Sequence, residues 1–206
     1  MKLCMIGTGY VGLVSGACFS DLGNDVICVD HDVKKIEKLK KGIIPIYEPG
    51  LEEIVLKNFK NKKLSFSANL KDSVSKSDII FICVGTPTKK NKNAADLSQI
   101  FNVANEISNS ITKYKIIITK STVPVTTGDE IEKIISKKVK KNLFSIVSNP
   151  EFLREGDAIH DFIYPDRVVI GTNDKRSNKI LKILYSSLVS KGAKYINTSR
   201  RAAELI

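Results

Sequence analysis

Hydrophobic positions recur along the chain in short runs, most of which are continuous and do not alternate with polar positions. Eight of these runs have the length of a β-strand. Continuous runs of this length are typical of strands that are buried on both faces, as in a parallel sheet covered by helices. The predicted strands are Leu3–Ile6, Val26–Val29, Leu64–Phe66, Ile79–Val84, Ile116–Thr119, Phe144–Val147, Val168–Ile170 and Tyr195–Ile196.

Between these runs, apolar residues follow the three- and four-residue spacing of helices with one buried face. The predicted helices are Val11–Leu22, Val33–Lys41, Leu97–Ile111, Gly128–Lys138 and Ser177–Val189. Alternating strands and helices require right-handed crossover connections, which favour an α/β fold with a doubly wound, mainly parallel sheet and helices on both faces. Lys89–Asn93 is the one obvious polar loop.

Length and charge narrow the class of protein. The chain has 206 residues, enough for one large domain or one and a half small ones, and 42% of them are hydrophobic. The net charge of +11 raises the possibility of nucleic-acid binding. However, lysines are spread over the polar helix faces and aromatic residues do not alternate with basic ones. We therefore expect a solvated basic surface and no nucleic-acid partner.

The uncharged stretch Leu3–Phe19 follows Lys2 and has some features of a signal peptide. Four glycines interrupt it, and no convincing cleavage site follows, so secretion is the less favoured interpretation. No segment is long enough to cross a bilayer, and no membrane partner is expected.

The cysteines and histidines indicate neither a metal site nor a redox pair. Each cysteine lies singly in an apolar run, and neither His31 nor His160 has a partner at the spacing of metal ligands. We expect buried, reduced thiols in a cytoplasmic protein, and no metal. The four cysteines are Cys4, Cys18, Cys28 and Cys83.

The motif GTGYVG, Gly7–Gly12, directly follows the first predicted strand and opens the first helix. In this context Gly7 allows a tight turn, Gly9 lets the backbone approach a diphosphate, and Gly12 lets the helix pack against the strand. Amides at the helix N-terminus would bind the diphosphate. The motif predicts a Rossmann-type dinucleotide-binding domain. A turn that binds nothing, or a methyltransferase that binds another nucleotide, is the alternative.

Asp30 ends the second predicted strand, 18 residues after Gly12. A carboxylate at this position accepts hydrogen bonds from the adenosine ribose and repels a 2′-phosphate, so NAD is favoured over NADP. Lys34 and Lys35 follow closely, and their charge weakens this preference.

Three further motifs each end a predicted strand. Because parallel strands end at one edge of the sheet, we expect these motifs to lie beside the glycine turn. They are CVGTP (Cys83–Pro87), KSTVPV (Lys120–Val125) and SNPEFLREG (Ser148–Gly156). A fourth motif, PIYEPGLEEIV (Pro45–Val55), has two prolines and a glycine before a short amphipathic helix, and its residues alone indicate a simple connector.

Taken together, these motifs resemble those of the nucleotide-sugar 6-dehydrogenases, the UDP-glucose/GDP-mannose dehydrogenase family, from Lys2 to Ile206. HDFIYPDRVVIG (His160–Gly171) and the terminal AAELI also match. The resemblance implies an enzyme that oxidises the C6 alcohol of a UDP-sugar to the carboxylate with two NAD, UDP-glucose being the expected substrate. UDP-N-acetylmannosamine or GDP-mannose dehydrogenases, and a non-catalytic NAD-binding module, are the alternatives.

The resemblance also implies roles for individual residues. Thr122 and Glu151 match the pair that holds a catalytic water. The residues implied to bind NAD are Gly7, Gly9, Tyr10, Val11, Gly12, Asp30, Lys35, Thr86, Thr122 and Glu155. Those implied to line the sugar diphosphate are Glu151, Phe152, Leu153, Arg154 and Glu155. Alternatively, Glu151 and Glu155 begin a helix and join Arg154 in a surface ion network. Thr126 stands where many family members have glycine.

The end of the chain predicts a further helix, capped by Ser199. The resemblance implies an NAD-binding domain over residues 1–198 and, over residues 199–206, the start of a central helix that also forms the homodimer interface. In the family a lysine, an asparagine and a nucleophilic cysteine follow, together with a substrate-binding domain. We therefore expect these 206 residues alone to be inactive.

Overall fold

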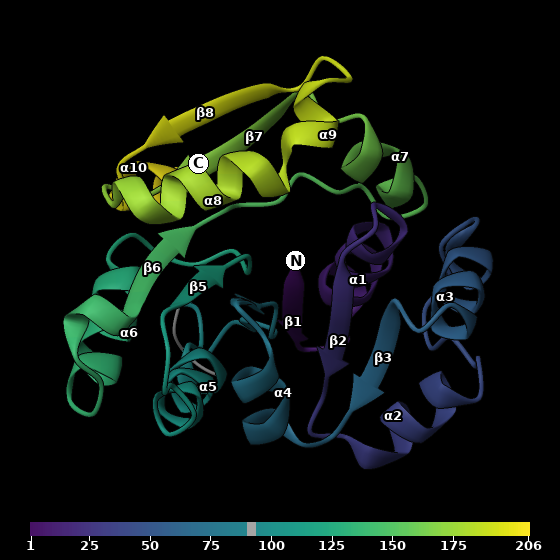
Figure 1. The fold of residues 1–206 in the computed structure, drawn as a ribbon, viewed down its shortest axis with the longest axis horizontal. Helices are drawn as coiled ribbons and strands as arrows, with labels where there is room; N and C mark the ends of the chain where they lie inside the picture. The colour runs from purple at the N-terminus through teal and green to yellow at the C-terminus, as the bar shows by residue number, and fades with distance from the viewer. Residues whose placement is uncertain (90–93) are drawn as a thin grey trace.

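The protein forms one eight-stranded sheet in a computed structural model that describes residues 1–89 and 94–206 (Figure 1). The strand order is β3-β2-β1-β4-β5-β6-β7-β8. All eight predicted strands are present to within two residues at either end. They are β1 (Lys2–Ile6), β2 (Asp25–Val29), β3 (Leu64–Ser67), β4 (Ile79–Ile82), β5 (Lys115–Thr119), β6 (Phe144–Ser148), β7 (Arg167–Gly171) and β8 (Lys194–Thr198).

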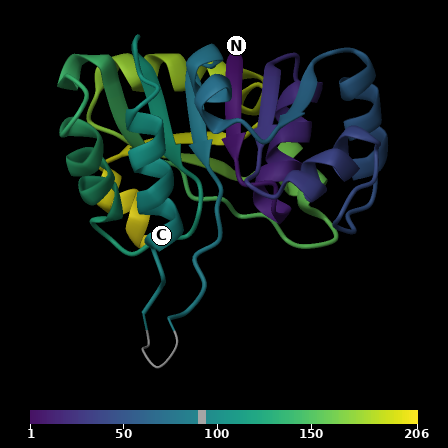
Figure 2. The ribbon, with the colours of Figure 1, turned by 90° about the horizontal axis from the view of Figure 1, so that it is seen from below.

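The six strands from β3 to β6 in this order run parallel, which confirms the mainly parallel sheet of the prediction. The sequence did not predict that β7 and β8, parallel to each other, run antiparallel to the rest. β6 and β7 meet at one residue pair, Ser148 and Gly171. Figure 2 shows β1 running downward from the N-terminus, so the carboxyl edge of the parallel strands lies at the bottom of that view.

The predicted helices are present, and two short ones are added. The helices are α1 (Tyr10–Asp21), α2 (Val33–Lys40), α3 (Leu51–Lys60), α4 (Leu70–Lys76), α5 (Ser98–Ser108), α6 (Thr127–Ser136), α7 (Ala158–Ile163), α8 (Lys175–Leu184), α9 (Ser186–Val189) and α10 (Arg200–Leu205), with a 3₁₀ turn at Lys141–Leu143. The sequence analysis missed α4 and α7, although Asn69 caps α4 and Asp157 lies at the N-cap of α7, and the predicted helix Ser177–Val189 is divided at Tyr185. Of the predicted polar loop Lys89–Asn93, residues 90–93 lie outside the described residues.

Two hydrophobic clusters cover the two faces of the sheet. Leu3 and Met5 of β1 belong to one cluster, while Cys4 and Ile6 belong to the other. Successive strand residues point to opposite faces, so burial of both faces explains the continuous apolar runs. α1, α2, α3, α7, α8 and α9 cover the first face, and α4, α5 and α6 cover the second.

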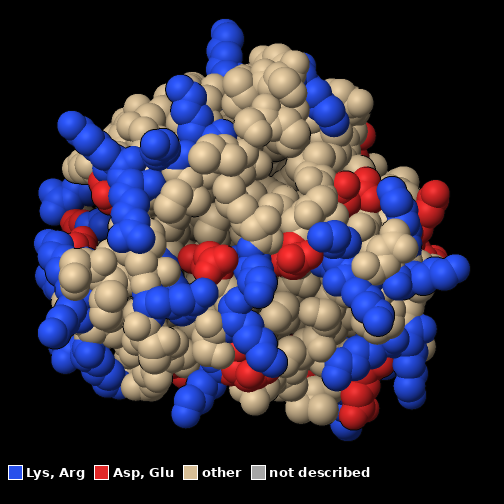
Figure 3. Space-filling view, in the orientation of Figure 1, with Lys and Arg blue, Asp and Glu red and all other residues tan. Residues whose placement is uncertain are grey.

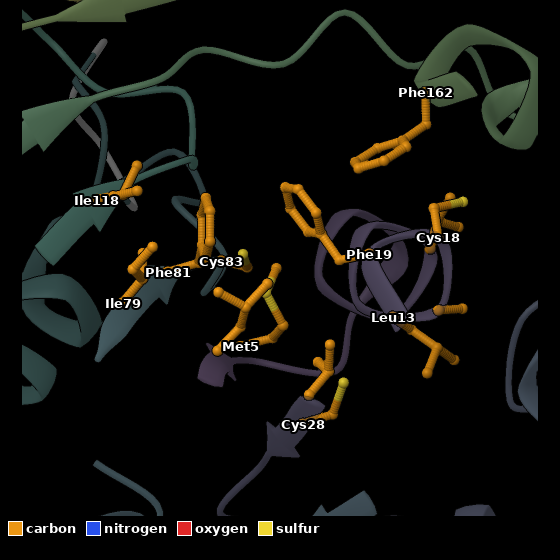
Figure 4. Close-up of a cluster of buried hydrophobic side chains, with 14 of the residues drawn as sticks. Met5, Leu13, Cys18, Phe19, Cys28, Ile79, Phe81, Cys83, Ile118 and Phe162 are labelled. Carbon is orange, nitrogen blue, oxygen red and sulfur yellow. The ribbon is translucent and has the colours of Figure 1, made fainter. Parts of the chain in front are cut away.

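Phe19 of α1 forms the centre of the first cluster, where it packs between elements that are distant in sequence (Figure 4). Its ring centroid lies 4.9 Å from that of Phe162 in α7, edge to face, and 5.2 Å from that of Phe81 in β4. The stretch Leu3–Phe19, which has features of a signal peptide, is therefore an integral part of the core. Within the described ranges, no helix combines the length and the apolar character needed to cross a membrane.

All four cysteines are buried and free, as expected. Burial raises the pKa of Cys18 and of Cys83 to about 12, and it also raises the pKa of Cys4 and Cys28. Buried thiols of this kind remain protonated at neutral pH, so they are poor nucleophiles. On the face drawn in Figure 3, Lys and Arg side chains are spread around the surface among acidic ones.

Candidate dinucleotide-binding site

The turn between β1 and α1 is tightly packed at Gly7 and Gly12 and is open to solvent at Gly9. Gly7 has a φ of +99°, and a Cβ there would lie 2.8 Å from the Cys83 carbonyl oxygen, so the position requires glycine. A Cβ on Gly12 would lie 1.9 Å from the Gly7 carbonyl oxygen. By contrast, a Cβ on Gly9 would meet no atom of the described residues within 4 Å. The backbone at Gly9 can therefore be approached from outside.

The N-terminus of α1 lies at this open position. Its N-cap is Gly9, which offers no side chain to the amides of the first turn, and that turn contains no acidic residue. The amides of Tyr10, Val11 and Gly12 therefore present hydrogen-bond donors and the positive end of the helix dipole to an incoming anion. This donor set fits a diphosphate.

Asp30, at the end of β2, is only 8% exposed and faces the glycine turn. Its Oδ2 accepts hydrogen bonds from the Thr8 amide (3.0 Å), the Thr8 hydroxyl (2.6 Å) and Lys35 Nζ (3.0 Å), while its Oδ1 accepts one from the Asp32 amide (3.1 Å). Burial opposes ionisation, but these donors outweigh it and hold the pKa of Asp30 well below its usual value. Thr8 was missed by sequence reasoning, although it lies within the glycine motif.

A cleft of about 860 Å³ opens beside Asp30. Gly7 of the glycine turn, Asp30 and His31 contribute to its wall. The opposite wall is formed by residues of α4 and α5 that no sequence motif indicated, including Leu70, Lys71, Gln99, Asn102, Val103 and Glu106. The glycine turn therefore lies next to a cleft that is large enough for a nucleoside.

The loops after β4 and β5 meet at the same edge of the sheet. The Thr86 hydroxyl donates a hydrogen bond of 3.0 Å to the Thr122 carbonyl oxygen, and Ser121 Oγ donates one of 2.7 Å to the Val84 carbonyl oxygen. Thr122 itself is exposed. The parallel pairing of β1, β4, β5 and β6 brings the four strand-end motifs to one edge.

Residues 151–155 follow β6 as an extended loop, and α7 begins only at Ala158. The interpretation of Glu151 and Glu155 as a helix start is therefore wrong. Glu151 Oε2 accepts a hydrogen bond from the Leu153 amide at 2.6 Å, and Leu153 packs against the first core cluster. Phe152 is 40% exposed, and the Arg167 guanidinium lies 4.6 Å from its ring centroid. Glu155 is exposed.

Arg154 does join a surface ion network, but with other partners than the alternative expected. Its guanidinium lies 2.8 Å from Asp157 and 2.6 Å from Asp161. The sequence analysis found no partner for His160 at the spacing of metal ligands, and this was wrong. One possible ligand atom from each of Asp157, His160 and Asp161 lies within 4.8 Å of the other two. Both carboxylates already pair with Arg154, so this trio is better explained as an ion network than as a metal site.

The buried carboxylate of Glu48 was also missed. It lies in the motif Pro45–Val55, whose residues alone indicated a connector, and it is only 6% exposed. It accepts hydrogen bonds from Tyr10 of the glycine turn and from the amides of Gly156 and Ala158. The signal that could have found it is an acidic residue next to Pro49 in an otherwise apolar stretch.

The last helix, α10, is firmly held by the rest of the domain. Ser199 caps it as predicted, accepting a hydrogen bond from the Ala202 amide at 3.2 Å. Glu204 in turn accepts hydrogen bonds of 2.7 Å from the amides of Thr126 and Gly128 at the start of α6. Thr126 has a φ of +80°, which explains why glycine would suit this position.

Comparisons with known proteins agree with this geometry. A family model described as the UDP-glucose/GDP-mannose dehydrogenase family, NAD binding domain, matches residues 1–189. The UDP-glucose 6-dehydrogenase of Rhizobium meliloti (strain 1021) is 49% identical over 208 residues, which cover 100% of this chain and 48% of that protein. The chain thus spans about half the length of the curated relatives it matches.

Two solved structures have the same fold. A ternary complex of GDP-mannose dehydrogenase from Pseudomonas aeruginosa superposes with a TM-score of 0.95 at 37% identity, covering 100% of this chain and 48% of that one. A UDP-glucose dehydrogenase from the archaeon Pyrobaculum islandicum gives a TM-score of 0.93 at 36% identity, covering 98% of this chain and 47% of that one.

Proposed function

Since the chain belongs to the UDP-glucose/GDP-mannose dehydrogenase family as its NAD-binding domain, we propose that it serves an enzyme that oxidises UDP-glucose to UDP-glucuronate. The observation that carries the proposal is the open backbone at Gly9 beside the ionised, buried Asp30. One feature offers donors to a diphosphate, and the other offers an acceptor to a ribose.

The amides of Gly9, Tyr10, Val11 and Gly12 would hold the diphosphate of NAD, and the residues of the cleft beside Asp30 would hold its adenosine. Oδ2 of Asp30 already accepts three hydrogen bonds, whereas Oδ1 accepts one from the Asp32 amide and lies 3.3 Å from His31 Nδ1, so Oδ1 is the oxygen that would accept a ribose hydroxyl. Lys35 supports the carboxylate through its 3.0 Å contact with Oδ2.

Thr86, Thr122 and Glu155, at the carboxyl edge of the sheet, would hold the nicotinamide end of NAD. Bound NAD supplies a hydride acceptor. In this proposal Thr122 and Glu151 hold a water. Glu151 takes up the proton released when the sugar alcohol is oxidised, or when water hydrolyses the thioester that the family's cysteine forms with the oxidised sugar. The contact of Oε2 with the Leu153 amide orients this carboxylate, and Phe152, Leu153 and Arg154 line the sugar diphosphate with it.

The whole enzyme uses two NAD per product, acts in the cytoplasm and forms a homodimer through a central helix that begins at residues 199–206. Residues 1–198 constitute the NAD-binding domain. These 206 residues bind NAD without turning over sugar, because the relatives are about twice as long and the family's lysine, asparagine and cysteine are not among them.

Two assays test the proposal. The 206-residue chain, incubated with NAD and UDP-glucose, is expected to produce no NADH, and steady NADH production would contradict the assignment of chemistry to residues outside it. The full-length enzyme is expected to prefer UDP-glucose in kcat/KM over GDP-mannose and UDP-N-acetylmannosamine. A preference for GDP-mannose would instead match the relative from Pseudomonas aeruginosa.

A further inference from the structure

The loop between α2 and α3 contains a buried acid that the proposed function does not yet use. Glu48 is only 6% exposed, whereas the neighbouring Tyr47 is 86% exposed. An ionisable side chain is seldom buried so completely unless hydrogen bonds or charges compensate for the lost water. The contacts of Glu48 supply this compensation from two distant parts of the chain.

One set of contacts holds the start of α7. Glu48 Oε1 accepts hydrogen bonds from the amides of Ala158 (2.9 Å) and Ile159 (3.4 Å). Asp157, the N-cap residue of α7, makes no capping hydrogen bond of its own. Glu48 therefore acts as the cap of this helix from more than a hundred residues away in the sequence.

The other set of contacts reaches the glycine turn. Glu48 Oε2 accepts hydrogen bonds from the Tyr10 hydroxyl and from the Gly156 amide (2.9 Å), and the same amide lies 2.9 Å from the Tyr10 oxygen. Burial and the hydrogen bond to Glu48 raise the pKa of Tyr10 to about 12, so Tyr10 is a neutral donor at physiological pH. Three loops thus meet at one carboxylate.

These contacts join the two sides of the proposed site. Tyr10 is the first residue of α1, on whose amides the diphosphate lies, and Gly156 directly follows the 151–155 segment that lines the sugar diphosphate. Hydrogen bonds to a carboxylate are stronger than those between neutral groups, so they fix the relative position of the two segments. Within the described residues, no other side chain forms hydrogen bonds with both Tyr10 and Gly156.

We propose that Glu48 is a positioning residue that couples the dinucleotide turn to residues 151–155 through Tyr10 and the Gly156 amide. The proposal rests on the proposed function, because it takes the turn as the cofactor side and the segment as the sugar side. Binding of NAD at the glycine turn would then restrain residues 151–155, and Glu151 would be held at a fixed distance from the cofactor.

Two variants separate this coupling from a merely structural cap. Tyr10→Phe removes the hydroxyl that reaches the turn and leaves the contacts of Glu48 with Ala158 and Ile159. Glu48→Gln replaces one acceptor oxygen with an amino group that faces donors, and it removes the negative charge that strengthens the hydrogen bonds to the remaining oxygen, so it weakens both sets of contacts. Tyr47→Phe, at the exposed neighbouring tyrosine, is the matched control.

The test is hydrogen exchange of residues 150–160 in the 206-residue chain, with and without NAD at a concentration that calorimetry shows to saturate each variant. In the wild type and in Tyr47→Phe, NAD is expected to slow exchange of this segment at least about threefold, since restrained amides open less often. In Tyr10→Phe and Glu48→Gln most of this NAD-dependent slowing is lost. Equal slowing in all four proteins, or none in a wild type that binds NAD, would overturn the coupling.

A kinetic arm uses the full-length enzyme with both substrates saturating. Glu48→Gln is expected to lower kcat about tenfold, because a small misplacement of catalytic groups has effects of this size. An unchanged kcat with a lowered Tm would show that Glu48 is only a structural cap. Absence of NAD binding in the wild type would instead refute the proposed function, which distinguishes the two failures.

Discussion

Two carboxylates in this protein stay ionised although they are partly buried. Asp30 and Asp174 both follow strands and accept hydrogen bonds from backbone amides and hydroxyl groups. At Asp30 these donors keep ionised the carboxylate that the proposed function assigns to the ribose. Asp174 lies far from the glycine turn and has a structural role, because it caps α8 and accepts hydrogen bonds from Ser145 and Tyr114.

Asp174→Asn is expected to lower stability in a pH-dependent way. Burial would raise the pKa of Asp174, but hydrogen bonds from Ser145 and the amides of Ser177 and Arg176 lower it to about 2. A carboxyl with a lowered pKa in the folded state stabilises above its unfolded pKa, and this contribution disappears as the pH falls toward the folded pKa. Urea denaturation should show a loss of about 1–2 kcal/mol at pH 7.

Between pH 4 and pH 2 the difference between this variant and the wild type should shrink. Asp166→Asn, at an exposed aspartate, serves as the control and should change little at any pH. A difference for Asp174→Asn that is the same at pH 7 and pH 3 would contradict the role of ionisation.

The backbone of Thr126 is strained, which lowers the stability of the folded protein. Its φ of +80° lies in the left-handed region, which a β-branched side chain adopts only with strain. Thr126→Gly removes this strain and keeps the amide that donates to Glu204, so we expect a gain of about 1 kcal/mol in unfolding free energy. Thermal and urea denaturation would measure it, and a loss of stability would show that the threonine side chain contributes contacts of its own.

At the scale of elements, local signals determined what could be predicted. The glycine turn, the longer helices and the terminal helix capped by Ser199 were predictable from the sequence, whereas the seven-residue α4 was missed although Asn69 caps it. The short helix α7 was not predicted, because it spans only six residues and its capping acceptor is Glu48 from a distant loop, while Asp157 at the N-cap makes no capping hydrogen bond. Likewise Thr8 and Glu48 act through contacts that form only when the chain has folded.

The glycine turn predicts different outcomes for two neighbouring substitutions. Gly12→Ala would place a Cβ 1.9 Å from the Gly7 carbonyl oxygen, so the variant is expected to be strongly destabilised or unfolded. Gly9→Ala meets no atom of residues 1–89 or 94–206 and should fold normally. Its methyl group would nevertheless occupy space that the diphosphate needs, so its NAD affinity should fall at least about tenfold.

Circular dichroism and calorimetry distinguish these two outcomes. A folded Gly9→Ala protein that binds NAD as tightly as the wild type would show that the diphosphate does not lie against this backbone. A stable Gly12→Ala protein would show that the packing of α1 on β1 tolerates a side chain.

At the scale of the whole molecule, a mainly parallel sheet brings four strand-end motifs to one edge. This convergence follows from the hydrophobic pattern, and it is why the sequence predicts so much of the candidate site. The reversed pair β7 and β8 was not predictable, because their short apolar runs do not specify direction. The far wall of the cleft was also missed, since Gln99, Asn102 and Glu106 of α5 are ordinary exposed helix residues by sequence.

The central claim is that the turn at Gly9 and the carboxylate of Asp30 together bind NAD, and isothermal titration of NAD into the wild type and into Asp30→Asn tests it most directly. We expect saturable binding of NAD to the wild type, weaker binding of NADP, and an affinity for NAD at least about tenfold lower in Asp30→Asn, a change of about 1.4 kcal/mol. Equal affinities for NAD in the two proteins, or no binding to the folded wild type at millimolar NAD, would contradict the claim.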